Sequence, residues 1–252
     1  MSVEHSLEGG VLTLTLARPQ KLNAISPALA AELQAGLVRA GEDDVRVVLL
    51  RGAGRSFCAG ADVRLALGAD RAGAERFLDL LADVLRRIHA LPKPVVAAVQ
   101  GDAVGGGAEL ALEADLRIVA DDARLCFPDV GLGSTPASAY QLVRHLGRAR
   151  AMRMALLGEP LDAAEMEELG LTVGVVAPER LKAAAATLAV RLRDAGPARS
   201  LALAKQAVTR AAEGSREAEL RANVGAMLAC HEDPRQRAYV SAFGRPGADA
   251  QQ

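Results

Sequence analysis

The feature that most constrains the fold is a pair of apolar runs, each followed by a glycine-rich loop and a helical pattern. The runs are VRVVLLRG at residues 45–52 and KPVVAAVQG at residues 93–101. Aliphatic and β-branched residues without alternation are typical of strands covered on both faces. Strands that alternate with helices favour parallel pairing with right-handed crossovers. We therefore expect an α/β fold around a buried parallel sheet.

The segments around these runs predict further strands and helices of the same core. Residues 2–19 favour a hairpin of two short strands around Gly9-Gly10. Ser26 is placed to cap a helix with Pro27 in its first turn. A long helix is expected at residues 72–90, and the segments DLRIVA and ARLCF predict two further strands before residue 128.

From about residue 139 the strand signals nearly vanish, apart from LTVGVVA at residues 171–177. Helical patterns are expected at residues 139–157, 162–169, 178–194, 197–212, 216–230 and 234–243. Gly196-Pro197 interrupts this series. We therefore predict an α/β core at residues 1–195 and a helical region at residues 196–252.

Composition and charge favour a soluble, cytoplasmic protein with no nucleic-acid or membrane partner. The 252 residues carry 30 basic and 31 acidic side chains, a net charge of −1. The first ten residues lack the basic start and apolar stretch of a secretory signal, and no window holds about 18 uncharged apolar residues. Cys58, Cys126 and Cys230 match no metal-binding spacing, so reduced thiols are expected.

The two glycine-rich loops raise the question of what lies against them. Neither matches a nucleotide-binding motif: GAGRSF has Phe57 where a dinucleotide fingerprint needs its third glycine, and GDAVGGGAE has the wrong spacing. A glycine loop that leads into a helix presents unpaired backbone N–H groups. One such group from each loop would form an oxyanion hole, whereas close helix–sheet packing without a ligand is the structural alternative.

Read together, the blocks ARPQKLNAIS, GAGRSFCAGADV and the segment from KPVVAAVQG to PDVGLG closely resemble the signature blocks of the crotonase superfamily, the enoyl-CoA hydratase/isomerase family. LLGEPLDAAEMEELGLTVGVV resembles a later segment of that family, and EDPRQRAYVSAF resembles its C-terminal helix more loosely. The resemblance implies a crotonase (ClpP-like) α/β spiral of repeated ββα units. It also implies a C-terminal helical region that serves in trimerisation or as a lid, and assembly as homotrimers or dimers of trimers.

The resemblance also implies an acyl-CoA thioester substrate, with no cofactor beyond the coenzyme A that is part of it. The thioester oxygen would lie between the backbone N–H groups of Ala61 and Gly106, and Glu109 and Asp129 would be the two carboxylates that handle water and protons. The residues that would bind the coenzyme A portion are Lys21, Leu22, Ala24, Arg55, Ala59, Gly60, Asp62, Val63 and Gly105.

Two departures from the family pattern keep the reaction open. Asp129 stands where hydratases have glutamate, which withdraws the carboxylate by about 1 Å, and misplacements of that size can cost about 10²-fold in rate. PASAY at residues 136–140 replaces a longer glycine-rich turn. We expect hydration of a trans-2-enoyl-CoA. The alternatives are isomerisation of an enoyl-CoA by one base and a catalytically weak homologue that only binds acyl-CoA.

Overall fold

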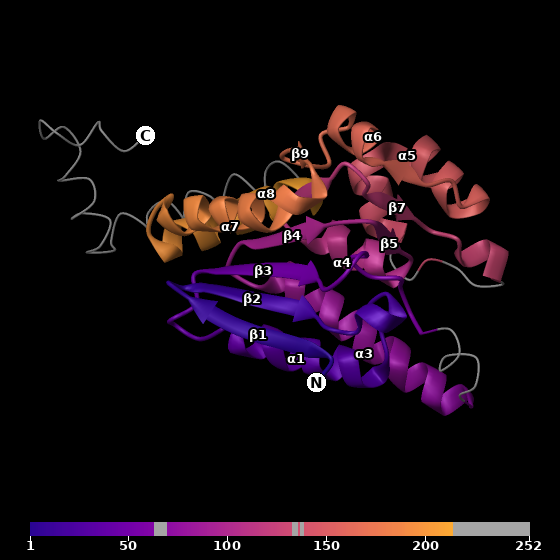
Figure 1. Ribbon diagram of the computed structural model, residues 1–252, viewed down its shortest axis with the longest axis horizontal. Coiled ribbons are helices and arrows are strands. Elements are labelled where there is room, and N and C mark those ends of the chain that lie inside the picture. The colour runs from indigo at the N-terminus through magenta and orange to yellow at the C-terminus, as the bar shows by residue number, and fades with distance from the viewer. Residues whose placement is uncertain (63–69, 133–135, 137–138, 214–252) are drawn as a thin grey trace, which may run out of the picture. The chain divides into compact units, whose positions relative to one another are not determined.

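Six strands form the larger sheet of the computed structural model, which describes residues 1–62, 70–132, 136 and 139–213. The strands, in spatial order, are β1 (Val3–Glu8), β2 (Val11–Leu16), β3 (Val47–Gly52), β4 (Val95–Val99), β6 (Leu116–Ala120) and β9 (Val175–Val176). β1 and β2 form the expected antiparallel hairpin, and every later neighbouring pair is parallel. The parallel sheet predicted from the two apolar runs is therefore confirmed (Figure 1).

A second, smaller sheet was not expected from the sequence. Its strands are β5 (Asp102–Val104), β7 (Arg124–Cys126) and β8 (Leu161–Asp162). β5 lies inside the segment that we interpreted as loop, and β8 lies just before the predicted helix at residues 162–169. β7 is the strand predicted from ARLCF, whereas β5 and β8 carry no detectable periodicity, and their pairing in the fold reveals them.

Helices follow the strands in the order that the sequence predicts. They are α1 (Pro27–Arg39), α3 (Arg71–Ala90), α4 (Gly106–Glu113), α5 (Ala139–Leu157), α6 (Ala163–Glu168), α7 (Pro178–Asp194) and α8 (Ala198–Glu213), with 3-10 turns η1 (Pro19–Lys21) and η2 (Asp129–Leu132). The Ser26 side chain accepts a hydrogen bond from Leu29 N–H at 3.2 Å, as expected of a helix cap. The helices predicted at 216–230 and 234–243 lie outside the described residues.

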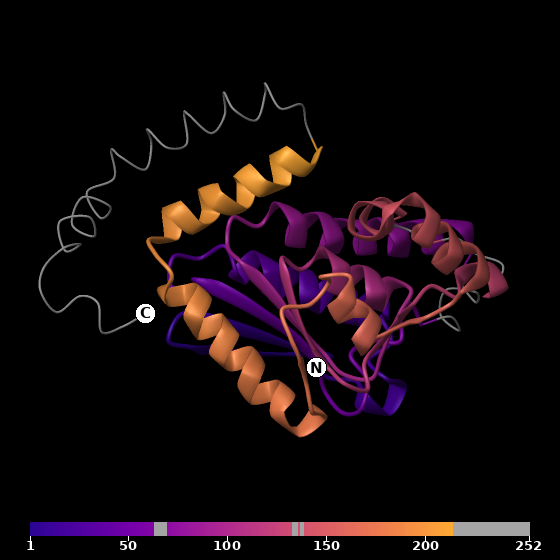
Figure 2. The ribbon, with the colours of Figure 1, turned by 90° about the horizontal axis from the view of Figure 1, so that it is seen from above.

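β3 shows why its sequence is apolar throughout. Val48 and Leu50 face the core that includes residues of α1, α3 and α4, whereas Val47 and Leu49 face the opposite core, which includes residues of α7. Successive side chains of a strand point to opposite faces, so a strand with a helix on each side needs no polar position. Figures 1 and 2 show these helices on the two faces of the sheet.

The chain divides into two compact units, Met1–Arg193 and Asp194–Gln252. The first contains both sheets, and the described part of the second is α8. Among the described residues, no helix is both long and apolar enough to cross a membrane.

Candidate active site

Backbone contacts hold the two glycine-rich loops against each other. Cys58 and Ala103 form an isolated parallel bridge, in which Cys58 N–H donates to Asp102 O at 3.1 Å and Val104 N–H donates to Cys58 O at 2.9 Å. A Cβ added at Gly107 would lie 2.2 Å from Cys58 O, a distance no side chain can occupy. The glycine run thus allows the start of α4 to approach the loop at residues 57–61.

This approach brings together the backbone N–H groups of Ala61 and Gly106. Ile25 N–H donates to Gly60 O at 2.7 Å and Asp62 N–H donates to Ile25 O at 2.9 Å, so in this parallel bridge Ala61 N–H points away from Ile25. Gly106 begins α4, where backbone N–H groups have no acceptor within the helix. A Cβ added at Gly106 would lie 3.9 Å from Ala61 N, so these two residues lie close together.

Glu109 lies in the first turn of the same helix. Its backbone N–H donates to Gly105 O at 2.9 Å, and the residue is only 2 % exposed. A carboxylate that only complemented the dipole of a surface helix would remain in solvent. Glu109 is thus a buried acidic residue in the helix that begins at Gly106.

The Asp129 carboxylate lies close to the Cβ position of Gly105. Asp129 begins η2, shortly after β7, and its Oδ1 and Oδ2 lie 3.6 and 3.8 Å from a Cβ added at Gly105. Burial raises the pKa of this carboxyl group above its ordinary value. Its Oδ2 is buried without a hydrogen bond from any described residue. A carboxyl group with a raised pKa keeps its proton to higher pH than an ordinary aspartate does.

Asn23 lies between Leu22 and Ala24, two residues assigned to the coenzyme A groove, and it was not among the residues expected from the sequence. It connects their segment to the loop at residues 53–57. Asn23 has φ +58°, is fully buried, and donates from Nδ2 to Ala53 O, Ser56 O and Phe57 O at 2.8, 2.9 and 3.1 Å. Next to it, Leu22 O accepts a hydrogen bond from Ala59 N–H at 2.9 Å. Asparagine is one of the few residues that adopts positive φ readily, which was the available sequence signal.

The charged residues assigned to this groove have different surroundings. Asp62 forms an ion pair with Arg18, with 3.3 Å between Oδ2 and Nη2. Lys21 ends η1 and is exposed. Val63 lies outside the described residues.

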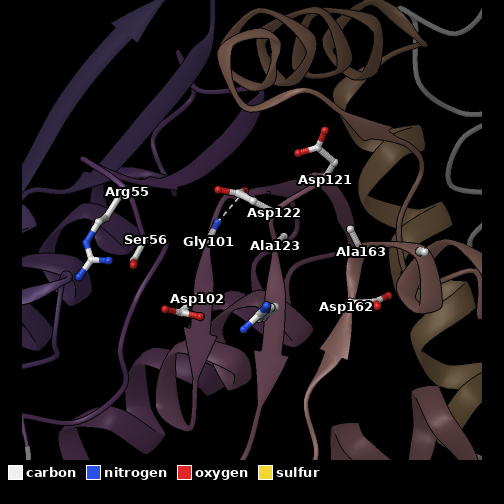
Figure 3. Close-up of a pocket in the computed structure, with 11 residues that line it drawn as sticks. Arg55, Ser56, Gly101, Asp102, Asp121, Asp122, Ala123, Asp162 and Ala163 are labelled. Carbon is white, nitrogen blue, oxygen red and sulfur yellow. Dashed lines mark hydrogen bonds between the residues drawn. The ribbon is translucent and has the colours of Figure 1, made fainter.

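Arg55 is not brought next to Ala61 and Gly106. It lines a separate cavity of about 550 Å³, together with Asp102, Arg124 and Asp162 (Figure 3). The parallel strands β5 and β7 begin at this cavity and lead, at their other ends, to Gly105 and Asp129. One end of the small sheet therefore carries the charged side chains that line this cavity, and the other end leads to Gly105 and the Asp129 carboxylate.

Cys58 and Cys126 are free thiols. Cys58 is fully buried, and burial raises its pKa to about 12, so it stays protonated at neutral pH. Its Sγ donates to Asn23 O at 3.2 Å. This thiol is a packing residue.

Comparisons of the sequence and of the structure with known proteins agree on the proteins that this chain resembles. The family model described as enoyl-CoA hydratase/isomerase matches residues 6–240. The 1,2-epoxyphenylacetyl-CoA isomerase of Escherichia coli K12 is 40 % identical over 225 residues, which cover 85 % of this chain and 84 % of the relative. The short-chain-enoyl-CoA hydratase of Clostridium acetobutylicum is 33 % identical over 240 residues, covering 94 % and 92 %. The structure of an enoyl-CoA hydratase from Bacillus anthracis superimposes with a TM-score of 0.92 at 29 % identity, covering 96 % of each chain.

Proposed function

Because this chain belongs to the enoyl-CoA hydratase/isomerase family, we propose that it adds water across the 2,3 double bond of a trans-2-enoyl-CoA. The observation that carries the proposal is a pair of acidic residues close to Gly105: Glu109, buried in the first turn of α4, and Asp129, whose carboxylate lies near the Cβ position of this glycine. The nearby N–H groups of Ala61 and Gly106 support the same reading. The fold of the solved hydratase matches this chain over nearly its whole length.

In the proposed reaction, the thioester oxygen accepts hydrogen bonds from Ala61 N–H and Gly106 N–H. Negative charge grows on this oxygen as C2 becomes enolate-like, and one such donor is worth about 3–4 kcal/mol in the transition state. One carboxylate removes a proton from water as its oxygen attacks C3, and the other delivers a proton to C2. Coenzyme A is part of the substrate, and the proposed mechanism needs no metal or redox cofactor.

Isomerisation of an enoyl-CoA is the second candidate. It is supported by Asp129, whose shorter side chain alters the two-carboxylate arrangement, and by the similarity to an isomerase at 40 % identity. One base that moves a proton along the acyl chain suffices for such a reaction. We also propose that the chain is cytoplasmic and assembles as a homotrimer or a dimer of trimers, as the family resemblance implies.

The test compares the wild-type protein with Glu109→Gln and Asp129→Asn on crotonyl-CoA, following loss of the enoyl-thioester absorbance. Hydration that falls by orders of magnitude in both variants supports the two-carboxylate mechanism. Loss in one variant only favours a one-base isomerase, which 3-enoyl-CoA substrates then test directly. A wild-type protein that binds the thioester but converts neither substrate contradicts both candidates.

A further inference from the structure

Arg18 forms hydrogen bonds with two segments close to Ala61, one at Ala24 and the other at Asp62. Its guanidinium donates from Nη1 to Ala24 O at 2.6 Å and from Nη2 to Asp62 Oδ2 at 3.3 Å. The side chains of this ion pair are only 19 % and 17 % exposed, so solvent and salt screen the pair less than a surface pair. Arg18 therefore links its own segment, at Ala24, to Asp62, which is 44 residues from Arg18 in sequence.

The position of Asp62 creates an electrostatic problem for the proposed reaction. Asp62 directly follows Ala61, and its backbone N–H is bound to Ile25 O. A carboxylate one residue from an oxyanion donor repels the negative charge that develops on the thioester oxygen. A positive charge beside the Asp62 carboxylate offsets this repulsion, and the Arg18 guanidinium supplies that charge.

We propose that Arg18 is a positioning residue for catalysis, which neutralises Asp62 and fixes the Ala61 segment so that the oxyanion hole can stabilise the enolate-like transition state. This inference rests on the proposed function. Arg18 itself need not touch the substrate, because it acts through Asp62 and Ala24. Its removal should therefore lower kcat more than it raises KM.

The proposal predicts a specific pattern in a double-mutant comparison. Arg18→Gln leaves the Asp62 charge without its partner, and kcat should fall about 10-fold or more. Adding Asp62→Asn to Arg18→Gln removes the repelling charge and should restore part of the lost kcat. A purely structural role predicts the opposite, because the second substitution would remove another contact.

The experiment measures kcat and KM for crotonyl-CoA, together with the ¹³C shift of the carbonyl in bound [1-¹³C]butyryl-CoA. The carbonyl shift reports polarisation by the oxyanion hole and needs no turnover. Arg39→Gln is the matched control, since Arg39 pairs with Asp44 at an exposed site on α1. This control should behave as the wild-type protein does.

The inference is supported if Arg18→Gln moves the carbonyl shift toward that of free thioester and the double variant reverses part of the change. It is overturned if Arg18→Gln matches wild type, or if the double variant is no better than Arg18→Gln. Arg18→Lys decides the question if Arg18→Gln does not fold. Because lysine keeps the charge, kcat near wild type supports neutralisation, whereas a loss as large as that of Glu109→Gln overturns it.

The two proposals fail in different ways. A wild-type protein that neither hydrates nor isomerises, but polarises the bound carbonyl in an Arg18-dependent way, contradicts the proposed reaction and supports the inference. Normal hydration that is indifferent to Arg18 contradicts the inference alone. A wild-type protein that leaves the carbonyl shift unchanged on binding overturns both.

Discussion

The Asp129 carboxylate lies directly against Gly105, so that a Cβ at this glycine would be 3.6 Å from Oδ1 and 3.8 Å from Oδ2. Gly105 also has φ +48° and precedes the first residue of α4. The same residue therefore sets the direction in which the helix presents Gly106 and the space that Asp129 occupies.

Gly105→Ala should lower both stability and turnover. The left-handed backbone costs a non-glycine residue about 1–2 kcal/mol, and the new methyl group would enter the space beside Asp129. Urea denaturation and kcat on crotonyl-CoA measure the two effects. Gly131→Ala is the control, because a Cβ there meets no atom of the described residues within 4 Å. Equal behaviour of the two variants would contradict this account of Gly105.

Asp129→Asn should increase the free energy of unfolding at pH 7. Burial raises the folded-state pKa of Asp129, so its ionisation destabilises the fold increasingly as the pH rises above the ordinary pKa of aspartate, and the full cost is reached above the folded-state pKa. The gain should shrink as the pH falls toward about 3.9, the ordinary pKa of aspartate, where both states are increasingly protonated. Denaturation curves at several pH values measure this gain.

Asp44 is the control for Asp129, because its pKa is shifted in the opposite direction. Arg39 lowers the pKa of Asp44 through a side-chain hydrogen bond, so the ionised form of Asp44 is favoured in the fold. Asp44→Asn should not stabilise the protein at pH 7, and its effect should disappear as the pH falls through the lowered pKa. The same sign for both variants would refute the burial argument for Asp129.

Asn23→Ala should destabilise the protein by about 3 kcal/mol or more. The substitution leaves two buried carbonyl groups and one part-buried carbonyl group without their shared donor, and it places alanine at positive φ. Asn23→Gly accepts the backbone angle but also loses the hydrogen bonds. The difference between the two variants in urea denaturation separates the backbone term from the hydrogen-bond term, and a negligible loss in Asn23→Gly would argue against the latter.

Arg117→Met should loosen the end of α4 that lies opposite Gly106. Arg117 is 6 % exposed and donates to Ala114 O and Leu171 O at 2.6 Å, and to Ala111 O and Leu112 O at 3.2 and 3.3 Å. Methionine fills similar volume but satisfies none of these acceptors, so a loss on the order of 3 kcal/mol is expected. Hydrogen exchange of the α4 amides checks it, and exchange as slow as in wild type would contradict this role.

Local patterns were enough to predict most of the larger sheet and its helices. The uninterrupted apolar runs of β3 and β4 indicate strands buried on both faces, and the bounds of α7 were predicted at Pro178 and Asp194. The Ser26 cap was readable because capping depends on residues within one turn. β5 and β8 were missed because strands this short are stabilised by their neighbours rather than by their own composition.

By itself, the sequence determined the α/β class, the parallel order of the buried strands and, through its signature blocks, the family. Only the tertiary structure decided that Asn23 binds three carbonyls of another loop, that Arg18 meets Asp62, and that Arg55 lines a separate cavity. The reason is physical. Periodicity and capping are interactions between near neighbours, whereas a site is made by contacts between distant segments, whose geometry depends on the packed fold.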